Sequence, residues 1–252
     1  MSIITLTTDY GLKDHFVGAL KGKILTENSE AKIVDISHNI EPFNTLQASY
    51  IIGAAYNSFP KGTVHLIGVD AEKNKENQHI AMQWNDHFFI CADNGILSIL
   101  TQKVVPQKMV AINIHDRLPE DATDLDVFVT VASHLSKGGL LNVIGKEITA
   151  IKEVTEIQPS VAADKNSIKG YVIYIDHFGN LYFNLTKKLF EEIGKGRSFA
   201  IPVRSQTTIN KFHERFVDVE VGNEVAFWGQ NDYLVISMNR EGGGDRAGTF
   251  NR

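Results

Sequence analysis

The stretch that decides the fold is the N-terminal one, Ile3-Ile4-Thr5-Leu6-Thr7-Thr8-Asp9-Tyr10-Gly11-Leu12-Lys13-Asp14. Its first residues are apolar and β-branched with no helical period, which predicts a strand that ends at Tyr10-Gly11. From Asp14 onward apolar residues recur every three to four positions, which predicts one face of a helix. Asp9 is therefore expected where a strand ends, and Asp14 where the next helix begins, either as a ligand contact or simply as its N-cap. In an open α/β sheet this edge is where ligands bind.

The following hundred residues repeat this alternation of strand and helix. The predicted segments are strands at 31–36, 63–69 and 109–114, a hairpin at 80–84 and 87–91, and helices at 45–56, at 96–100 and after a cap within 121–126. Short connections between such segments predict an α/β domain with a mostly parallel sheet and flanking helices.

The character of the sequence changes after residue 151. Residues 152–166 carry charged residues and a proline without periodicity and are interpreted as a linker. Short alternating segments follow, for example at 170–176, 199–203, 216–221, 225–228 and 233–238, with a helix predicted only at 187–193 and a flexible tail at 241–246. We therefore expect an α/β domain over 1–151 and a smaller all-β, barrel-like domain over 167–252.

Composition excludes several classes of function. The chain has 252 residues, 43% hydrophobic and 22% charged, with a net charge of −5, so no cationic field favours nucleic acid or an anionic membrane. No apolar run approaches the length of a membrane span and no signal peptide is recognised, so a cytoplasmic protein is expected. The single cysteine, Cys91, lies in an apolar run and is interpreted as a buried structural thiol.

Carboxylates and amides recur at the ends of predicted strands. They are Asp9, Asp70, Asp93 and Asn94 in the first domain and Asp176 and Asn180 in the second. Each alone could cap a helix or close a turn, but together they favour a polar small-molecule site at a sheet edge. No phosphate loop, dinucleotide fingerprint, zinc-ligand spacing or nucleophile elbow is found, so no metal and no cofactor are predicted.

These residues stand in segments that resemble a known family. The segments are Thr7-Thr8-Asp9-Tyr10-Gly11-Leu12-Lys13-Asp14, Val17-Gly18-Ala19-Leu20-Lys21-Gly22, Val34-Asp35-Ile36-Ser37-His38, Phe59-Pro60-Lys61-Gly62-Thr63-Val64-His65, Val69-Asp70, Ala92-Asp93-Asn94-Gly95 and Ile175-Asp176-His177-Phe178-Gly179-Asn180-Leu181. In this order they resemble the S-adenosyl-L-methionine hydroxide adenosyltransferases, relatives of the fluorinase and chlorinase. The resemblance implies an α/β domain followed by a β-barrel domain, and a homotrimer that binds S-adenosylmethionine between neighbouring subunits.

The resemblance also implies roles for individual residues. Asp9 would hold the ribose diol, Asp14 would lie near the methionine amine, and Phe43 would pack beside the ribose. In the second domain Asp176 would bind the methionine part and Asn180 would read adenine. Asn94 and Phe178 complete the set of expected substrate-binding residues.

The implied reaction is attack of water or hydroxide on the ribose carbon that bears the sulfonium, which releases adenosine and methionine. The family uses an Asp, an Arg and a His, and Asp70 matches the first. Asn77 stands at the Arg and Thr123 at the His, and neither can replace the cation or the proton acceptor. A shifted register would bring Lys75 or His79 to the site, and Asp124 is a further candidate helper.

Two classes of function follow. The first is a hydrolase of S-adenosylmethionine with a variant catalytic site formed by Asp70, Asn77 and Thr123. The alternative is a weakly active or inactive relative that binds S-adenosylmethionine or adenosine as a sensor or scaffold. An enzyme acting on a related nucleoside is a third reading. Halogenation is disfavoured, because Asp70 places negative charge where a halide would approach.

Overall fold

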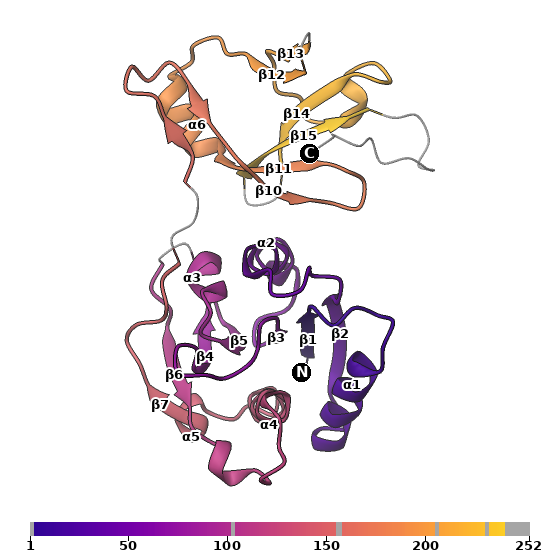
Figure 1. The fold of residues 1–252 in the computed structure, drawn as a ribbon, viewed down its shortest axis with the longest axis vertical. Helices are drawn as coiled ribbons and strands as arrows, with labels where there is room; N and C mark the ends of the chain where they lie inside the picture. Colours follow the sequence, from indigo (N-terminus) through magenta and orange to yellow (C-terminus); the bar gives the residue numbers. More distant parts are fainter. Residues whose placement is uncertain (1–2, 102–103, 155–157, 205–206, 230–231, 240–252) are drawn as a thin grey trace. The chain divides into compact units, whose positions relative to one another are not determined.

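The computed structural model describes residues 3–101, 104–154, 158–204, 207–229 and 232–239. The chain divides into two compact units, Met1–Thr155 and Glu156–Arg252. In the first unit a seven-stranded sheet lies between two layers of helices, and the second unit is built from smaller antiparallel sheets (Figure 1). The predicted fold class, an α/β part followed by a smaller all-β part, is confirmed.

The large sheet of the first unit has the strand order β2-β1-β3-β5-β4-β6-β7. Its strands are β1 (Ile3–Thr8), β2 (Lys32–Ser37), β3 (Val64–Gly68), β4 (His79–Trp84), β5 (His87–Ala92), β6 (Lys108–Ile112) and β7 (Gly145–Glu147). The helices are α1 (Phe16–Glu27), α2 (Thr45–Ala55), α3 (Ile96–Thr101), α4 (Asp124–Ser136) and α5 (Leu141–Ile144), with single 3-10 turns at Tyr56–Ser58 and His115–Arg117.

The sheet is mixed rather than mostly parallel, which corrects the prediction. Strands β2, β1, β3 and β5 run parallel, whereas β4, β6 and β7 pair antiparallel with their neighbours. The reversal arises at the predicted hairpin turn, where Asn85 and Asp86 have φ angles of 49° and 62°. Asn and Asp tolerate this left-handed conformation, which a two-residue hairpin turn requires. As a result, the start of β4 and the end of β6 lie at the same edge as the carboxyl ends of β1, β3 and β5.

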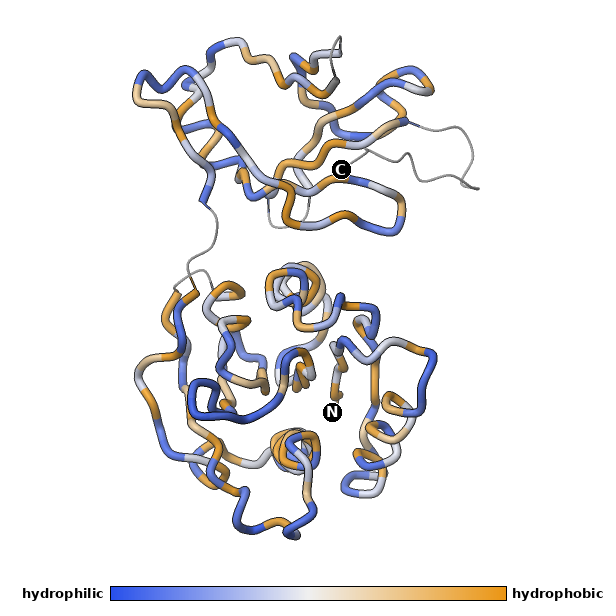
Figure 2. The backbone as a smooth tube through the Cα atoms, in the orientation of Figure 1, coloured by the Kyte–Doolittle hydropathy of each residue, from blue (hydrophilic) through white to orange (hydrophobic). Residues whose placement is uncertain are grey.

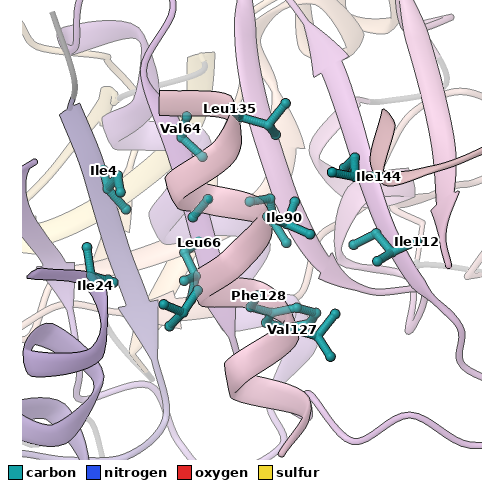
Figure 3. Packing of buried hydrophobic residues seen from close by; sticks show 14 of the residues in the cluster. Ile4, Ile24, Val64, Leu66, Ile90, Ile112, Val127, Phe128, Leu135 and Ile144 are labelled. Atoms are coloured by element: carbon teal, nitrogen blue, oxygen red, sulfur yellow. The ribbon is translucent and has the colours of Figure 1, made fainter. Parts of the chain in front are cut away.

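Helices cover both faces of this sheet. On one face α1 and α4 pack their apolar sides onto the central strands, and Figure 3 shows Val127, Phe128 and Leu135 of α4 lying over Leu66 and Ile90. On the other face α2 and α3 cover a second cluster that contains the buried Cys91. Burial of each large apolar side chain contributes about 1.5–3 kcal/mol, so the two layers fix the sheet edge firmly.

The second unit contains a four-stranded antiparallel sheet in the order β10-β11-β15-β14 and two two-stranded ribbons, β12-β13 and β8-β9. The strands are β8 (Ser160–Val161), β9 (Ile168–Lys169), β10 (Val172–Ile175), β11 (Leu181–Thr186), β12 (Ile201–Arg204), β13 (Thr207–Ile209), β14 (Glu224–Trp228) and β15 (Tyr233–Met238). Helix α6 (Lys187–Gly194) confirms the helix predicted there.

Three sequence predictions differ from the structure. The strand expected at 216–221 is a 3-10 turn, Phe216–Asp218, because the Asp218 carboxylate accepts the backbone N–H groups of Glu214 and Arg215 and closes the turn. Part of the predicted linker, 152–166, is strand β8. Helix α1 takes His15 rather than Asp14 as its N-cap. The predicted flexible tail, 241–246, lies outside the described residues.

Candidate functional site

Asp70 follows β3 in a conformation that the surrounding residues enforce. Its φ is 45°, in the left-handed region that Asp tolerates better than most residues. The buried amide of Asn94 donates to the carbonyl oxygens of both Val69 and Asp70, at 3.0 Å each. The Asn94 carbonyl oxygen in turn accepts the N–H of Ile96 at the start of α3. Asn94 thus connects the turn that carries Asp70 to the start of α3.

Asp9 lies at the carboxyl end of β1, as predicted, and its carboxylate contacts the loop that carries Phe43. The Phe43 N–H donates to Asp9 Oδ2 at 3.0 Å. Phe43 has a φ of 64°, an outlier for an aromatic residue, and its side chain is 72% exposed. A strained backbone that displays an aromatic ring beside a carboxylate is the kind of feature that clusters at ligand sites.

The Tyr10 phenol connects this region to α4. Burial raises the pKa of Tyr10 to about 12, and the negative charges of Asp9 and Asp124 add to the shift. A Cβ placed on Gly68, near the end of β3, would lie 3.3 Å from the Tyr10 hydroxyl. The ends of β1 and β3 and the start of α4 therefore come together around this phenol.

Two of the three predicted catalytic side chains are engaged away from Asp70. Asn77 Oδ1 accepts from Lys152 Nζ at 2.9 Å. The Thr123 hydroxyl caps α4, donates to Asp126 Oδ2 at 2.7 Å, and borders a hollow of about 610 Å³ between α1 and α4. Among the described residues, neither side chain hydrogen-bonds to Asp70. Asp14 is exposed, one residue before the N-cap of α1.

A histidine pair connects the segment after Asp70 to the start of α4. His79, the first residue of β4, is fully buried, and its Nε2 lies 3.0 Å from the carbonyl oxygen of Ala71 and 3.6 Å from Asp124 Oδ1. Its Nδ1 lies 3.2 Å from Nε2 of His115, which follows β6. Asp124 Oδ2 also accepts the Lys73 N–H at 2.9 Å. Residues 72–78, a hydrophilic stretch in Figure 2, are thereby connected to the start of α4.

Sequence reasoning named His79 and Asp124 as candidates but missed His115. Neither histidine matches a motif, because their contact depends on pairing between β4 and β6, strands far apart in the sequence. The only local signal was the position of His79 directly before the strand predicted at 80–84. Burial lowers the pKa of both rings, so the neutral form is favoured near neutral pH.

In the second unit, Asp176 and Asn180 organise a tight turn after β10. The Asp176 carboxylate accepts the N–H groups of Phe178 and Asn180 at 2.9 Å each and the Asn180 side-chain amide at 2.7 Å. The Ser237 hydroxyl of β15 donates to the Asn180 side-chain oxygen. The turn presents Phe178, which is 77% exposed. Here the polar residues form the frame, and the aromatic ring is displayed to the outside.

The described residues show neither a metal-binding cluster nor a membrane-spanning helix. Three or more His, Cys, Asp or Glu side chains do not gather in the geometry of a metal site anywhere in that part of the chain. Nor does any helix there combine the length and apolar character that crossing a membrane requires.

Comparison with known proteins adds to this geometry. Residues 4–145 match the model of the SAM hydroxide adenosyltransferase N-terminal domain, and residues 170–249 match that of the C-terminal domain. The chain is similar to an (R)-S-adenosyl-L-methionine hydrolase of Methanocaldococcus jannaschii, 31% identical over 74% of this chain and 68% of that protein. It is also similar to a fluorinase of Nocardia brasiliensis, 23% identical over 94% of this chain and 90% of the other.

A solved structure extends the likeness to the fold. An uncharacterised conserved protein from Thermotoga maritima superposes with a TM-score of 0.81 at 29% identity, covering 94% of this chain and 92% of that one. This chain has an α/β unit with carboxylates along one sheet edge, followed by a unit of antiparallel sheets. The chain belongs to the SAM hydroxide adenosyltransferase family.

Proposed function

We propose that this protein hydrolyses S-adenosyl-L-methionine to adenosine and methionine. Support comes from membership of the family and from relatives named (R)-S-adenosyl-L-methionine hydrolase. The observation that carries the proposal is the turn at Asp70, which Asn94 fixes at the edge shared with Asp9. In this proposal the Asp70 carboxylate would lie beside the bound nucleoside.

The chemistry asks little of the protein besides alignment. Water attacks the ribose carbon, the new C–O bond forms as the C–S bond breaks, and the electron pair passes to sulfur. The leaving group is a neutral thioether, so no general acid is required. In the proposed mechanism Asp70 orients the water, and exclusion of bulk solvent aligns a weak nucleophile.

The proposed binding residues are those expected from the sequence. We divide them into residues that would contact the ligand and residues that would hold the turns carrying them. Asp9 would accept the ribose hydroxyls, Phe43 and Phe178 would supply aromatic surfaces, and Asp14 would interact with the methionine amine. We assign Asn94, Asp176 and Asn180 to holding the turns that present these groups, because their side chains already make hydrogen bonds within the protein.

A ligand-holding protein without turnover is the second candidate. It is favoured by Asn77 and Thr123, which stand at the family's Arg and His and make hydrogen bonds to Lys152 and Asp126 instead. A homotrimer in the cytoplasm, with ligand between subunits, belongs to the proposal on the strength of the resemblance.

The test is turnover and binding measured together. Purified protein is incubated with S-adenosylmethionine, adenosine and methionine are followed by chromatography, and affinity is measured by calorimetry. Asp70→Asn should abolish adenosine release and leave affinity within about threefold. Asp86→Asn is the matched control, since Asp86 is also an aspartate with positive φ, in the hairpin turn. Binding without release in the wild-type protein supports the second candidate, and an active Asp70→Asn variant defeats the mechanism.

A further inference from the structure

The His79–His115 pair bridges the two segments that carry the family's catalytic positions. His79 Nε2 reaches the carbonyl of Ala71, next to Asp70, and also approaches Asp124, next to Thr123. His79 is fully buried, with Phe128 of α4 packed against its ring at 4.5 Å between centroids. The pair therefore connects the segment directly after Asp70 to the start of α4, the two segments in which this chain lacks the family's Arg and His.

The contacts fix the protonation of both rings. A carbonyl oxygen can only accept, so His79 Nε2 must carry a hydrogen. In a neutral ring Nδ1 of His79 is then an acceptor, and His115 Nε2 must donate to it. Of the four ring nitrogens, only His115 Nδ1 then keeps a free lone pair of electrons. The pair can therefore take up one proton, at the His115 end, without breaking either hydrogen bond.

The charges around the pair are of both signs. Asp124 faces both rings, and Asp116 acts on His115; both carboxylates favour a positive charge there. Lys73, on the loop after β3, opposes it. Tyr10 also faces Asp124, and its raised pKa keeps the phenol neutral. The two rings are neutral and can accept a proton, and the nearby carboxylates stabilise the positive charge until the proton is released.

We propose that the His79–His115 pair is the proton acceptor of this site, with His115 taking the proton and His79 acting as the positioning residue that fixes its tautomer. This inference rests on the proposed function. As water forms its bond to the ribose carbon and the C–S bond breaks, one proton of that water must leave. It passes to His115 Nδ1 and then to solvent, which restores the neutral pair, while the electron pair of the broken bond stays on sulfur.

The decisive variant keeps the hydrogen bond between the two side chains and removes the ring that takes up a proton. In His115→Gln the amide still donates to His79 Nδ1 but binds no proton. We expect kcat to fall about 100-fold, in the range typical of lost proton transfer, with KM changed less than twofold. Burial lowers the pKa of His115, so wild-type kcat should decline only below the pH range in which histidine ordinarily takes up a proton. This decline should be absent in His115→Gln.

The role of His79 is tested by a conservative pair. His79→Gln retains an N–H for the Ala71 carbonyl and should keep several-fold more activity than His79→Leu, which offers none. His134→Gln is the matched control, because His134 lies in the last turn of α4, at the other end of that helix from Asp124, and its Nε2 lies 3.2 Å from the Leu140 carbonyl oxygen. It should match the wild type at every pH.

A measurement without substrate completes the test. Nitrogen-15 NMR of histidine-labelled protein should show His79 as the Nε2–H tautomer from pH 5 to 8 and proton uptake at His115. An Nδ1–H tautomer for His79, or a wild-type kcat and pH profile in His115→Gln, overturns the inference. If the wild-type protein releases no adenosine, the proposed function fails and the inference fails with it. Wild-type turnover with an unaffected His115→Gln variant removes the inference alone.

Discussion

Asp9 is held in place by the Phe43 N–H before any ligand arrives. At the residue scale this predicts that Asp9→Ala weakens S-adenosylmethionine binding at least tenfold, because a ribose would lose a charge-assisted acceptor. Calorimetric titration measures the change. Asp121→Ala removes an exposed carboxylate at the entrance to α4 and should bind as the wild type does. Unchanged affinity in Asp9→Ala would remove the ribose assignment.

Phe43 combines a strained backbone with an exposed ring. We predict that Phe43→Gly binds S-adenosylmethionine more weakly by fivefold or more, yet loses no stability and gains up to about 1 kcal/mol, because glycine adopts positive φ without steric cost. Thermal unfolding and calorimetry are the measurements. Leu140→Gly is the control, an exposed apolar residue at a φ of −95°, which should lose stability instead. A destabilised Phe43→Gly protein would show that the ring serves packing.

At the scale of elements, the core of β3 contains a buried polar network. His65 is 1% exposed, its Nδ1 lies 2.7 Å from the Thr5 hydroxyl and its Nε2 lies 3.1 Å from Nδ1 of His87. Burial, with a smaller contribution from His87, lowers the pKa of His65 to about 3. The ring thus stays neutral in the folded sheet under conditions where it charges in the unfolded chain.

This depressed pKa predicts a loss of stability in acid. Between about pH 6.5 and 3 the unfolded state binds the proton and the folded state does not, so the free energy of unfolding falls as pH falls. The contribution of His65 amounts to about 2 kcal/mol lost between pH 7.5 and pH 5. Urea unfolding at both values measures it, and His65→Gln should show a smaller difference. Equal differences in the two proteins would contradict the assignment.

Cys91 makes a second prediction for the core of the sheet. Its thiol is fully buried, and burial raises its pKa well above the ordinary value, with Asp93 adding to the shift. A disulfide reagent should therefore leave the native protein unmodified for hours and modify one thiol per chain once denaturant is added. Rapid labelling of the native protein would show that β5 opens.

How far the sequence predicts these elements depends on how local their causes are. The hairpin at Asn85-Asp86, a helix cap within 121–126 and the helix at 187–193 follow from neighbouring residues, and all were predicted. The structure identifies the capping residue as Thr123. The segment at 216–221 alternates like a strand, yet Asp218 closes it as a turn through contacts that alternation does not reveal. The same holds for the site: Asp9 and Asp70 follow from strand ends, whereas His115 depends on the pairing of β4 with β6.

At the scale of the whole molecule, exposed apolar residues lie on both units. Leu12, Phe16 and Phe43 are exposed in the first unit, and Ile175 and Phe178 in the second. Apolar surface of this kind beside candidate binding residues fits the homotrimer that the resemblance implies. Analytical ultracentrifugation should give a mass near three times the 28.0 kDa of one chain. A monomer at micromolar concentration would contradict it.

The proposal of a site between subunits makes a sharper prediction. Asp9→Ala in one chain and Asp176→Ala in another should each give a homotrimer of strongly reduced activity at limiting S-adenosylmethionine, since each damages every site. Co-expressed in one cell, the two variants should recover part of the activity, because mixed trimers contain sites built from two undamaged halves. Activity measured on purified mixed trimers tests this. Failure to recover in verified mixed trimers would mean that each chain supplies both halves of its own site.

The reversal of direction at the β4–β5 hairpin has a consequence for how this protein can vary. Parallel strands offer only their final residues to the edge, and those residues lead into loops. Because β4 runs the other way, its first residue, His79, reaches the same edge from within the rigid sheet. The segment between Asp70 and His79 can therefore change in length and sequence while the side chains at its two anchors keep their places. A functional side chain that is absent from this loop can therefore be replaced by a side chain of the sheet itself, such as His79.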